Sequence, residues 1–402
     1  MRSGVQGFLG AKLAEARQAR GITSRKALAD LMQRAASTVI RWEEGETSPE
    51  PAALAELSAV LAVPEDYFLT EREGQAGPAF FRSFAGALRG ERLVQQIRIV
   101  WLEDVAAVAE HYAFLPEVSV PDLLGARSFK TLRDDDIEAL AGELREQWGL
   151  GLRPIPDMVV LLENNGVVVG SEPMETTQLD GLSRWGRDGR PYVLLASDKQ
   201  SFARRQFDAA HELAHLVLHR AVSEVEFEEN FRLIEDQAHR FASAFLLPAS
   251  QFGVEIDSIT MWELERLKLR WRVSIKAQIM RLQRLNIIDR GLSTRLYKAY
   301  SAKGYQSGGE PYDDVWLLQQ PSTLADVFKA LIDAGQVTKE TLCLDLPLFP
   351  HDVESLANLP SGWLTMETAR VVSLKPEARP RRSEDREQTS KVFQFPNRRD
   401  GK

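Results

Sequence analysis

The most constraining feature of the chain is a group of polar residues inside an otherwise apolar helix. The run from Phe207 to His219 reads FDAAHELAHLVLH, in which His211 and His215 are four residues apart. Residues four apart share one face of an α-helix, so both imidazoles can bind one ion. Glu212 projects beside them, where a carboxylate can act on an activated water. The segment predicts a buried helix with a zinc site, because unpartnered polar groups are costly to bury.

A metal site of this kind needs a third protein ligand and one open position for water. Glu235 lies within the run 234–248, IEDQAHRFASAFLLP, on a helical face that it shares with His239. We expect Glu235 to be the third ligand, because the other acidic run, at 224–229, reads as a solvated loop. His239 either contacts the site or is structural, and His219 either orients a ligand or caps its helix. The alternative for the whole group is a polar core without a metal.

Three ligands and a neighbouring glutamate predict a zinc-dependent endopeptidase. Zinc would acidify a bound water and polarise the scissile carbonyl, while Glu212 would act as general base. The candidate donors to the developing oxyanion are His239, Tyr192 and Arg184. The strand expected at 192–196, just before the metal helix, is a candidate for pairing with an extended peptide.

Composition narrows the remaining possibilities. Cys343 is the only cysteine, so one chain can form neither a disulfide framework nor a cysteine-based zinc site. The charged N-terminus lacks the apolar core of a signal peptide, and the chain lacks a run of about 18 apolar residues. A net charge of −8 argues against bulk coating of nucleic acid but permits a local basic patch. We expect a cytoplasmic protein without membrane contact.

Patterns along the chain predict an α+β protein that is mainly α. Residues 1–70 read as an all-α helix-turn-helix domain, whose short helices end at signals such as Gly21 and Gly45. A helical linker region is expected at 71–155, and a zincin-like metallopeptidase domain at 156–300. This domain should contain a small sheet, an HExxH helix and a trailing helical pair. A helical C-terminal region at 301–375 and a disordered tail at 376–402 are expected to follow.

The small sheet is expected from β-branched runs between turn signals. MVVLLENNGVVVG begins at Met158 and PYVLLAS begins at Pro191, and Asn-Asn-Gly and Gly-Arg-Pro mark the turns. Residues 80–148 look helical, with a break at the proline-containing segment 116–121. Helices resume at Arg204 and carry the metal-binding residues.

Basic residues outnumber acidic ones in the first 41 residues, whereas acidic residues cluster after Glu43. This surplus predicts a surface for DNA phosphates, and we expect double-stranded DNA to bind through residues 1–70. The residues at the positions of base or phosphate contacts are Arg34, Ala36, Ser37, Thr38 and Arg41. The alternative is a helix-turn-helix that serves protein contact or dimerisation.

A second basic surplus lies at 266–290, in the helical pair that follows the peptidase core. The turn Trp271-Arg272-Val273-Ser274 again joins two helices. This surface is either a second nucleic-acid contact or, as we expect, a solvated structural face.

The two peptidase motifs resemble those of the ImmA/IrrE family of metallopeptidases. The resemblance rests on HELAHLVLH, on EDQAHRFASAFLLP and on the upstream LSRW…GRPYVLLASDKQSFARRQFDAAHELAH. GAKLAEARQARGIT, VIRWEEGETSP and LAVPEDYF resemble an XRE-type, Cro/repressor-like helix-turn-helix. This chain departs from that pattern at Gln33 and Arg34, and its recognition helix is poor in basic and amide side chains. FFRS at 80–83, EPYDDV and LKPEARP extend the resemblance over nearly the whole chain.

The resemblance implies both a site and a function. In that family the HExxH histidines and a downstream glutamate bind zinc, which maps onto His211, His215 and Glu235, with Glu212 catalytic. The implied activity is cleavage of a repressor or other transcription factor after a stress or mobile-element signal. The alternatives are a DNA-binding repressor whose peptidase domain acts as a sensor, and a toxin–antitoxin component that acts through partner binding. DNA, a protein substrate and a second copy of the chain are the candidate partners.

Overall fold

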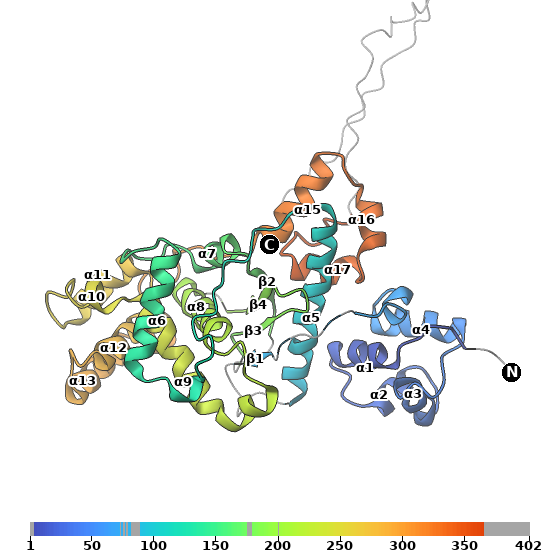
Figure 1. The fold of residues 1–402 in the computed structure, drawn as a ribbon, viewed down its shortest axis with the longest axis horizontal. Helices are drawn as coiled ribbons and strands as arrows, with labels where there is room; N and C mark the ends of the chain where they lie inside the picture. Colours follow the sequence, from blue (N-terminus) through green and yellow to red (C-terminus); the bar gives the residue numbers. More distant parts are fainter. Residues whose placement is uncertain are drawn as a thin grey trace, which may run out of the picture. The chain divides into compact units, whose positions relative to one another are not determined.

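The structure is a computed structural model that describes residues 4–72, 74, 77, 79–81, 89–174, 179–199 and 201–365. The tail expected at 376–402 lies outside these residues, as does the end of the FFRS motif. Within the described part of the chain, no helix has both the length and the apolar character that crossing a membrane requires. The prediction of an α+β, mainly α protein is confirmed (Figure 1).

The chain runs from an all-α N-terminal part through a mixed centre to an all-α C-terminal part, and Figure 1 follows this order by colour. The helices are α1 Gly10–Ala19, α2 Arg25–Leu31, α3 Ala36–Glu43, α4 Pro51–Leu61, η1 Glu65–Phe68, α5 Arg89–Tyr112, η2 Phe129–Thr131, α6 Asp134–Gln147, α7 Met158–Asn164, α8 Phe202–Leu218, α9 Glu224–Leu246, α10 Ala249–Phe252, α11 Met261–Trp271, α12 Ile275–Arg284, α13 Arg290–Ala302, α14 Tyr305–Gly308, α15 Thr323–Asp333, α16 Lys339–Asp345 and α17 Pro350–Leu356. The strands are β1 Phe80–Phe81, β2 Val168–Glu172, β3 Gly181–Trp185 and β4 Pro191–Ala196.

Helices α1 to α4, together with η1, form the helix-turn-helix part. Ser24 caps α2 by accepting a hydrogen bond from the Ala27 amide at 3.0 Å, and Pro51 begins α4. Between α2 and α3 the chain turns through Gln33, whose φ of 51° is left-handed. The fully buried side chains of this part include Leu13, Leu28, Val39, Leu57 and Leu61. Its helices therefore share an apolar core, which is continuous with the core around α5.

A four-stranded sheet with the order β1-β3-β4-β2 forms the mixed centre. Strand β3 is antiparallel to both β1 and β4, and β2 is parallel to β4. Every residue of β2, β3 and β4 is buried, which explains why their sequences do not alternate between apolar and polar. The strands expected at GVVVG and PYVLLAS are confirmed. β3 was not expected, and β1 lies in the stretch 80–148 that looked helical, so that part of the expectation is wrong.

Helices α5 and α8 pack on the sheet. Tyr192 and Leu194 of β4 share a hydrophobic core with α5, whereas Val193 and Leu195 share a second core with α8. Because successive residues of a strand point to opposite faces, the two helices lie on opposite faces of the sheet. The strand register therefore decides which side chains reach helix α8.

The strand expected at MVVLLEN is wrong, because Met158–Asn164 form helix α7. Asp157 caps this helix by accepting a hydrogen bond from the Val160 amide at 3.0 Å. Val160 is 45% exposed, while Val159 and Leu162 are buried. This one-sided burial is typical of a surface helix and differs from the burial of a central strand on both faces.

The acidic run at 224–229 is helical and not the loop that its composition suggested, because α9 begins there. Ser223 and Glu226 form a reciprocal capping box that stabilises this start. Most carboxylates of the run are still exposed, as expected for a solvated segment. Backbone geometry departs from helical values at Asn230, so the run precedes a kink and the straight segment beyond it carries Glu235.

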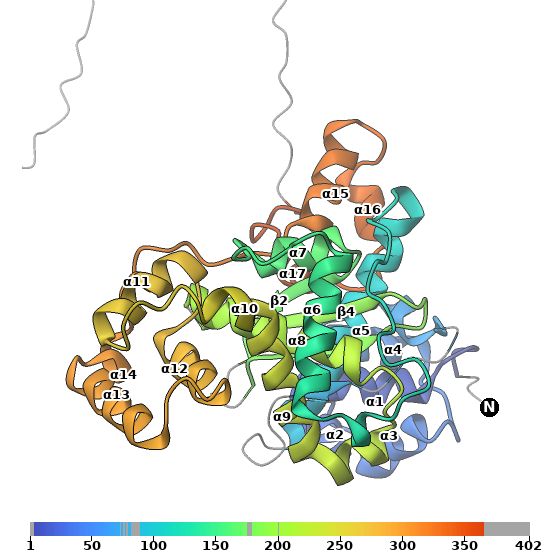
Figure 2. The same ribbon diagram turned by 60° about the vertical axis from the view of Figure 1, so that its left-hand side comes forward.

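Helices α11 to α14 pack on one another and form the helical group that Figure 2 shows in yellow to orange. The basic side chains of 266–290 are largely paired within the protein. Lys268 is fully buried, with its ammonium 2.9 Å from Glu310, and Arg281 pairs with Glu138. These pairs support the structural interpretation of the second basic surplus.

Candidate metal centre

Two helices that pack along each other carry the candidate ligands. Helix α8 begins after Ser201, which accepts a hydrogen bond from the Arg204 amide, and ends at Leu218, with His219 as its C-cap. Nearly all of its side chains are buried, including His211 and His215 at 0% exposure. Helix α9 lies against α8 and brings its own buried carboxylate to the two imidazoles. The prediction that the helix carrying His211 and His215 is buried is therefore confirmed.

The three predicted ligands form a compact tripod. The Nε2 atoms of His211 and His215 are 3.1 Å apart, and they lie 3.4 Å and 3.3 Å from the two carboxylate oxygens of Glu235. Ligand atoms about 2.0–2.1 Å from a tetrahedral zinc lie roughly 3.3–3.4 Å from one another. The spacing of the three side chains therefore fits a tetrahedral ion of this size.

Glu235 has few other ways to satisfy its charge. Its side chain is buried, and neither carboxylate oxygen accepts a hydrogen bond of good geometry within the described structure. Burial alone would raise the pKa of Glu235, but the nearby His211 and His215 rings hold that pKa well below its usual range. A buried carboxylate aimed at two imidazole nitrogens is the donor set expected of a divalent metal site.

A chain of hydrogen bonds orients His215 from behind. Its Nδ1 lies 3.1 Å from Nδ1 of His219, and Nε2 of His219 lies 3.1 Å from Oε1 of Gln237. The Gln237 amide in turn donates to the carbonyl oxygen of Phe129 at 2.8 Å. Burial, together with the neighbouring His215, lowers the pKa of His219 to about 3, so His219 is neutral. If His215 binds a metal through Nε2, every donor in this chain has an acceptor.

Glu212 is held by strand β3. The Ser183 hydroxyl donates to Oε2 of Glu212 at 2.7 Å, and both residues are almost fully buried. A Cβ on Gly181 would lie 3.3 Å from Oε1 of Glu212, so the strand backbone passes directly beside this carboxylate. One oxygen of Glu212 is thus fixed by a donor, while the glycine leaves room beside the other.

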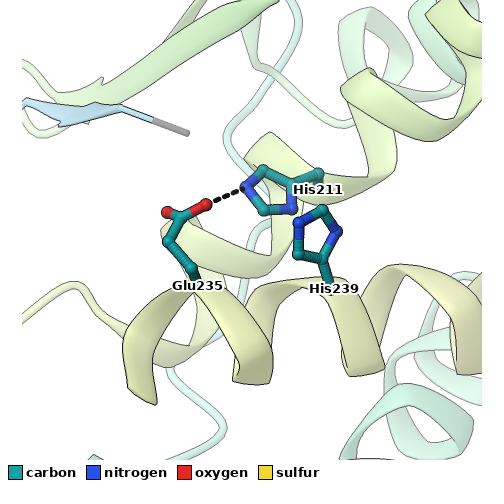
Figure 3. Close-up of side chains that lie close together, drawn as sticks. All are labelled: His211, Glu235 and His239. Atoms are coloured by element: carbon teal, nitrogen blue, oxygen red, sulfur yellow. Dashed lines mark ion pairs between the residues drawn. The ribbon is translucent and has the colours of Figure 1, made fainter. Parts of the chain in front are cut away.

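His239 lies one turn beyond Glu235 on α9, as Figure 3 shows, and its ring centroid is 4.5 Å from that of His211. One ligand atom each of His211, Glu235 and His239 lie within 4.8 Å of one another, so His239 is also a candidate metal ligand. The His211–His215–Glu235 set has shorter separations, closer to tetrahedral edges. His239 is therefore better placed as a neighbour of the metal than as its ligand.

The other two candidate oxyanion donors lie on the wrong face of the sheet. Arg184 and Tyr192 are direct cross-strand partners, and they point away from Ser183 and therefore away from α8. Arg184 lies 3.1 Å from Glu103 on α5, and the Tyr192 hydroxyl donates to Asp188 at 2.7 Å. Of the three candidates, the structure leaves His239.

The expected pairing of a substrate with residues 192–196 is also wrong. Strand β4 lies inside the sheet, where β3 occupies one of its edges and β2 the other. Its main-chain groups are therefore already hydrogen-bonded on both sides.

The predicted DNA-contact residues lie together at the third helix. Four are on α3 and one is in the turn before it: Ala36, Ser37, Thr38, Arg41 and Arg34. Ser37 and Arg41 are exposed. Arg34 is 36% exposed, and its guanidinium lies 2.9 Å from the carboxylate of Glu56. The outer face of α3 is thus open to water, and its role in DNA binding remains a prediction.

Much of the basic surplus of the first 41 residues forms ion pairs within the protein, so less of it is available to DNA phosphates than the sequence suggested. Arg17 and Arg25 both pair with the buried carboxylate of Glu43, at 2.6 Å and 2.7 Å. Within the described part of this stretch, Lys26 and Arg41 are exposed and form no ion pair. The free positive charge near α3 is therefore small.

Sequence reasoning missed three residues that contact the site. Ser183 and Gln237 lie inside the motifs LSRW and EDQAH, whose resemblance to the family was the only available signal. Phe80 lies in FFRS, and its ring stacks on that of His215 with centroids 5.2 Å apart and planes within 3°. None of the three has a spacing to HELAH that predicts contact.

Two family models match parts of the chain. Residues 162–283 match the family model of the IrrE N-terminal-like domain, a peptidase family, and residues 9–67 match that of a helix-turn-helix domain. The tripod, Glu212, Ser183 and Gln237 all fall within the first match. A search of curated proteins finds no match to the chain. The predicted combination of an N-terminal helix-turn-helix with an ImmA/IrrE-type domain is confirmed, and the second domain has a metallopeptidase-like fold.

Proposed function

We propose that this chain, which joins a helix-turn-helix domain to an IrrE N-terminal-like domain, is a zinc-dependent endopeptidase that cleaves a repressor or other transcription factor. The observation that carries the proposal is the tripod of His211, His215 and Glu235, with Glu212 beside it. The family resemblance supports a transcription factor as substrate and a stress or mobile-element signal as trigger. A chain retaining only a sensor function would have no physical need for Glu212 and the donor that orients it.

In this proposal each residue has one task. A bound ion of the zinc type would supply an acidified water and polarise the scissile carbonyl. Glu212, oriented by Ser183, accepts the proton of the attacking water and returns it to the leaving amine. His239 donates to the carbonyl oxygen as negative charge develops there. His219 and Gln237 keep His215 in the tautomer that presents Nε2 to the ion.

The test uses purified full-length chain and its Glu212→Gln variant. We expect both to retain one equivalent of zinc by elemental analysis, because Glu212 is not a ligand. Only the wild type should cleave helix-turn-helix repressors encoded beside its own gene, as followed by mass spectrometry. A wild type that holds zinc but leaves every such repressor intact would refute the peptidase proposal. Loss of zinc in Glu212→Gln would show that Glu212 has been given the wrong role.

We also propose that α3 contacts double-stranded DNA, because its outer face is exposed and residues 9–67 match a helix-turn-helix model. Few basic side chains remain free there, so we expect weak binding with a shallow salt dependence. The double variant Arg34→Ala/Arg41→Ala should reduce affinity for promoter DNA, and Arg240→Ala, at a half-buried arginine on α9, serves as control. Equal binding by all three proteins would refute the α3 assignment.

A further inference from the structure

We propose that strand β1 competes with the peptide substrate for one edge of the sheet. The segment that follows the helix-turn-helix part occupies the edge of β3 to which an extended substrate must pair. This inference rests on the peptidase function proposed above and adds the regulation of that site and a preference in its substrate.

The position of Glu212 identifies the edge that a substrate would use. Ser183 of β3 donates to Glu212, and the Gly181 backbone lies beside the same carboxylate. Extended peptides bind to sheet edges through main-chain hydrogen bonds. Because β4 is enclosed by β3 and β2, the side of β3 that faces away from β4 is the edge that would lead a bound peptide past Glu212.

The chain's own strand β1 already occupies this side. Phe80 is opposite Ser183, and Phe81 is opposite Leu182, in antiparallel register. Three residues before Phe80, the Gly77 amide donates a hydrogen bond to the carbonyl oxygen of Trp185 at 2.9 Å. These partners span most of β3, so a substrate strand and β1 cannot pair with it at the same time.

Phe80 anchors this occupant in the metal centre. It is opposite Ser183 and therefore points to the same face of the sheet as the bond to Glu212. Its ring lies flat on His215 and edge-on to Phe227, with a centroid distance of 5.3 Å to the latter, and only 1% of it is exposed. In Figure 3, β1 (light blue) ends on the side of the site where Glu235 lies.

The shape of this contact also defines the competitor that could displace β1. β1 pairs through two residues, whereas β3 offers five, from Gly181 to Trp185, to a longer peptide. Removal of β1 would empty the space between His215 and Phe227. A displacing peptide therefore binds best when it places an aromatic side chain opposite Ser183. We infer that the preferred substrate is an extended segment with an aromatic residue at that position.

A reversible lock tests the competition. The variant Phe81→Cys/Leu182→Cys, made in a Cys343→Ser background, places two thiols at directly opposed positions of β1 and β3. Any packing defect from the substitutions is common to the oxidised and reduced forms. The probes are acetohydroxamate, which needs only the metal, and a fluorescent five-residue peptide hydroxamate with a central phenylalanine.

We expect oxidation to weaken the peptide hydroxamate at least tenfold and to leave acetohydroxamate and zinc affinity unchanged, because apparent affinity scales with the open fraction. In the otherwise native chain, Gly77→Pro removes the amide donor to Trp185 and should tighten the peptide probe several-fold. Gly77→Ala keeps that donor and should bind like the wild type.

The outcomes separate this inference from the proposed function. One outcome is that zinc and acetohydroxamate bind while the affinity for the peptide hydroxamate is changed neither by oxidation of the disulfide variant nor by Gly77→Pro. In that case β1 is a permanent part of the fold and the competition is refuted. If the chain holds no zinc and binds neither hydroxamate, the peptidase proposal fails and the inference fails with it.

Discussion

The Ser183 hydroxyl contacts Glu212 from strand β3, which carries on its other face Arg184, paired with Glu103 of α5. At the scale of single residues, the candidate centre therefore depends on a donor that is not a metal ligand. Groups that orient the reacting side chains typically matter by 10–100-fold.

We expect Ser183→Ala to lower kcat by roughly 10–100-fold, because Glu212 loses the donor that fixes its carboxylate. Zinc affinity, measured by competition with a chromophoric chelator, should stay within twofold of wild type. Ser171→Ala is the matched control, since Ser171 is another buried strand serine and its hydroxyl has no hydrogen-bond partner within the described structure. An unchanged kcat in Ser183→Ala would show that this hydrogen bond has no role in the reaction.

Gln33, one of the two positions at which the chain departs from the helix-turn-helix pattern, has a strained backbone conformation. Its φ of 51° lies in the left-handed region, which a glycine adopts more easily. Gln33→Gly should raise the free energy of unfolding by about 0.5–1 kcal/mol, seen as a higher Tm. Asn286→Gly, at a φ of 55°, should gain less, because asparagine already tolerates this conformation. A lower Tm for Gln33→Gly would mean that the Gln33 side chain makes a stabilising contact.

At the scale of elements, the packing of α8 against α9 places the ligands and the chain of hydrogen bonds behind them. Gln237 accepts from His219 and donates to the carbonyl of Phe129, so it joins α9 to the segment before α6. The orientation of His215 is thus decided by an element that is distant in sequence.

Gln237→Leu should weaken zinc binding by roughly 10–100-fold, because His219 loses its acceptor and no longer holds His215 in one tautomer. The readout is zinc affinity by chelator competition. Gln278→Leu controls for the loss of a buried glutamine, since Gln278 donates to the carbonyls of Leu264 and Val273. It should lower stability without changing zinc affinity. Equal zinc affinities in both variants would refute the positioning role of Gln237.

Helix α1 carries a buried cation whose effect depends on pH. Burial and the nearby Arg72 lower the pKa of Lys12 from 10.5 to about 8. Between these values the unfolded chain binds the proton and the folded chain does not, so this group makes stability rise as pH increases from about 8 to 10.5. At pH 7 the charged form opposes folding.

Lys12→Met should therefore raise the free energy of unfolding at pH 7, by roughly 1–3 kcal/mol. This advantage over the wild type should shrink progressively towards pH 10.5, because the folded wild type has already lost the proton. Denaturant unfolding of both proteins at several pH values gives the difference between their free energies of unfolding. The contributions of the other titrating groups are the same in both proteins and cancel in this difference. A difference that is independent of pH would show that Lys12 keeps its ordinary pKa.

At the scale of the whole described chain, one buried carboxylate joins three distant segments. Asp352 of α17 lies 2.6 Å from Arg20 of α1 and 2.5 Å from Arg98 of α5, and 3% of its side chain is exposed. Arg20 also donates to the carbonyls of Leu61 and Ala62. The helix-turn-helix part and the C-terminal helices therefore share a buried ion-pair cluster.

Asp352→Ala should lower the free energy of unfolding by about 3–5 kcal/mol, because it leaves two arginines without their carboxylate. Asp134→Ala breaks the exposed pair with Arg240, whose aspartate side chain is 70% exposed, and should cost less than about 1 kcal/mol. Denaturant unfolding measures both. Similar small losses would show that Asp352 does not join these segments energetically.

Local patterns in the sequence were sufficient to select the candidate ligands and to predict the two kinds of domain. His211 and His215 share a face because a helix repeats every 3.6 residues, and Glu235 follows from the same periodicity on the next helix. The sequence also carried the signals for α2, α4 and strands β2 and β4. These features depend on neighbours within a few residues, so no knowledge of the packing was needed.

Only the tertiary structure decided which side chains surround those ligands. Ser183, Gln237 and Phe80 reach the centre through strand register and helix packing, and local spacing carries no information about either. The same reason explains the wrong predictions. MVVLLEN forms a helix that is buried on one face and not a strand. Arginines of the N-terminal basic surplus form ion pairs with Glu43 and Asp352, which are distant in sequence. The chemistry of the site is local, whereas access to it depends on contacts between distant segments.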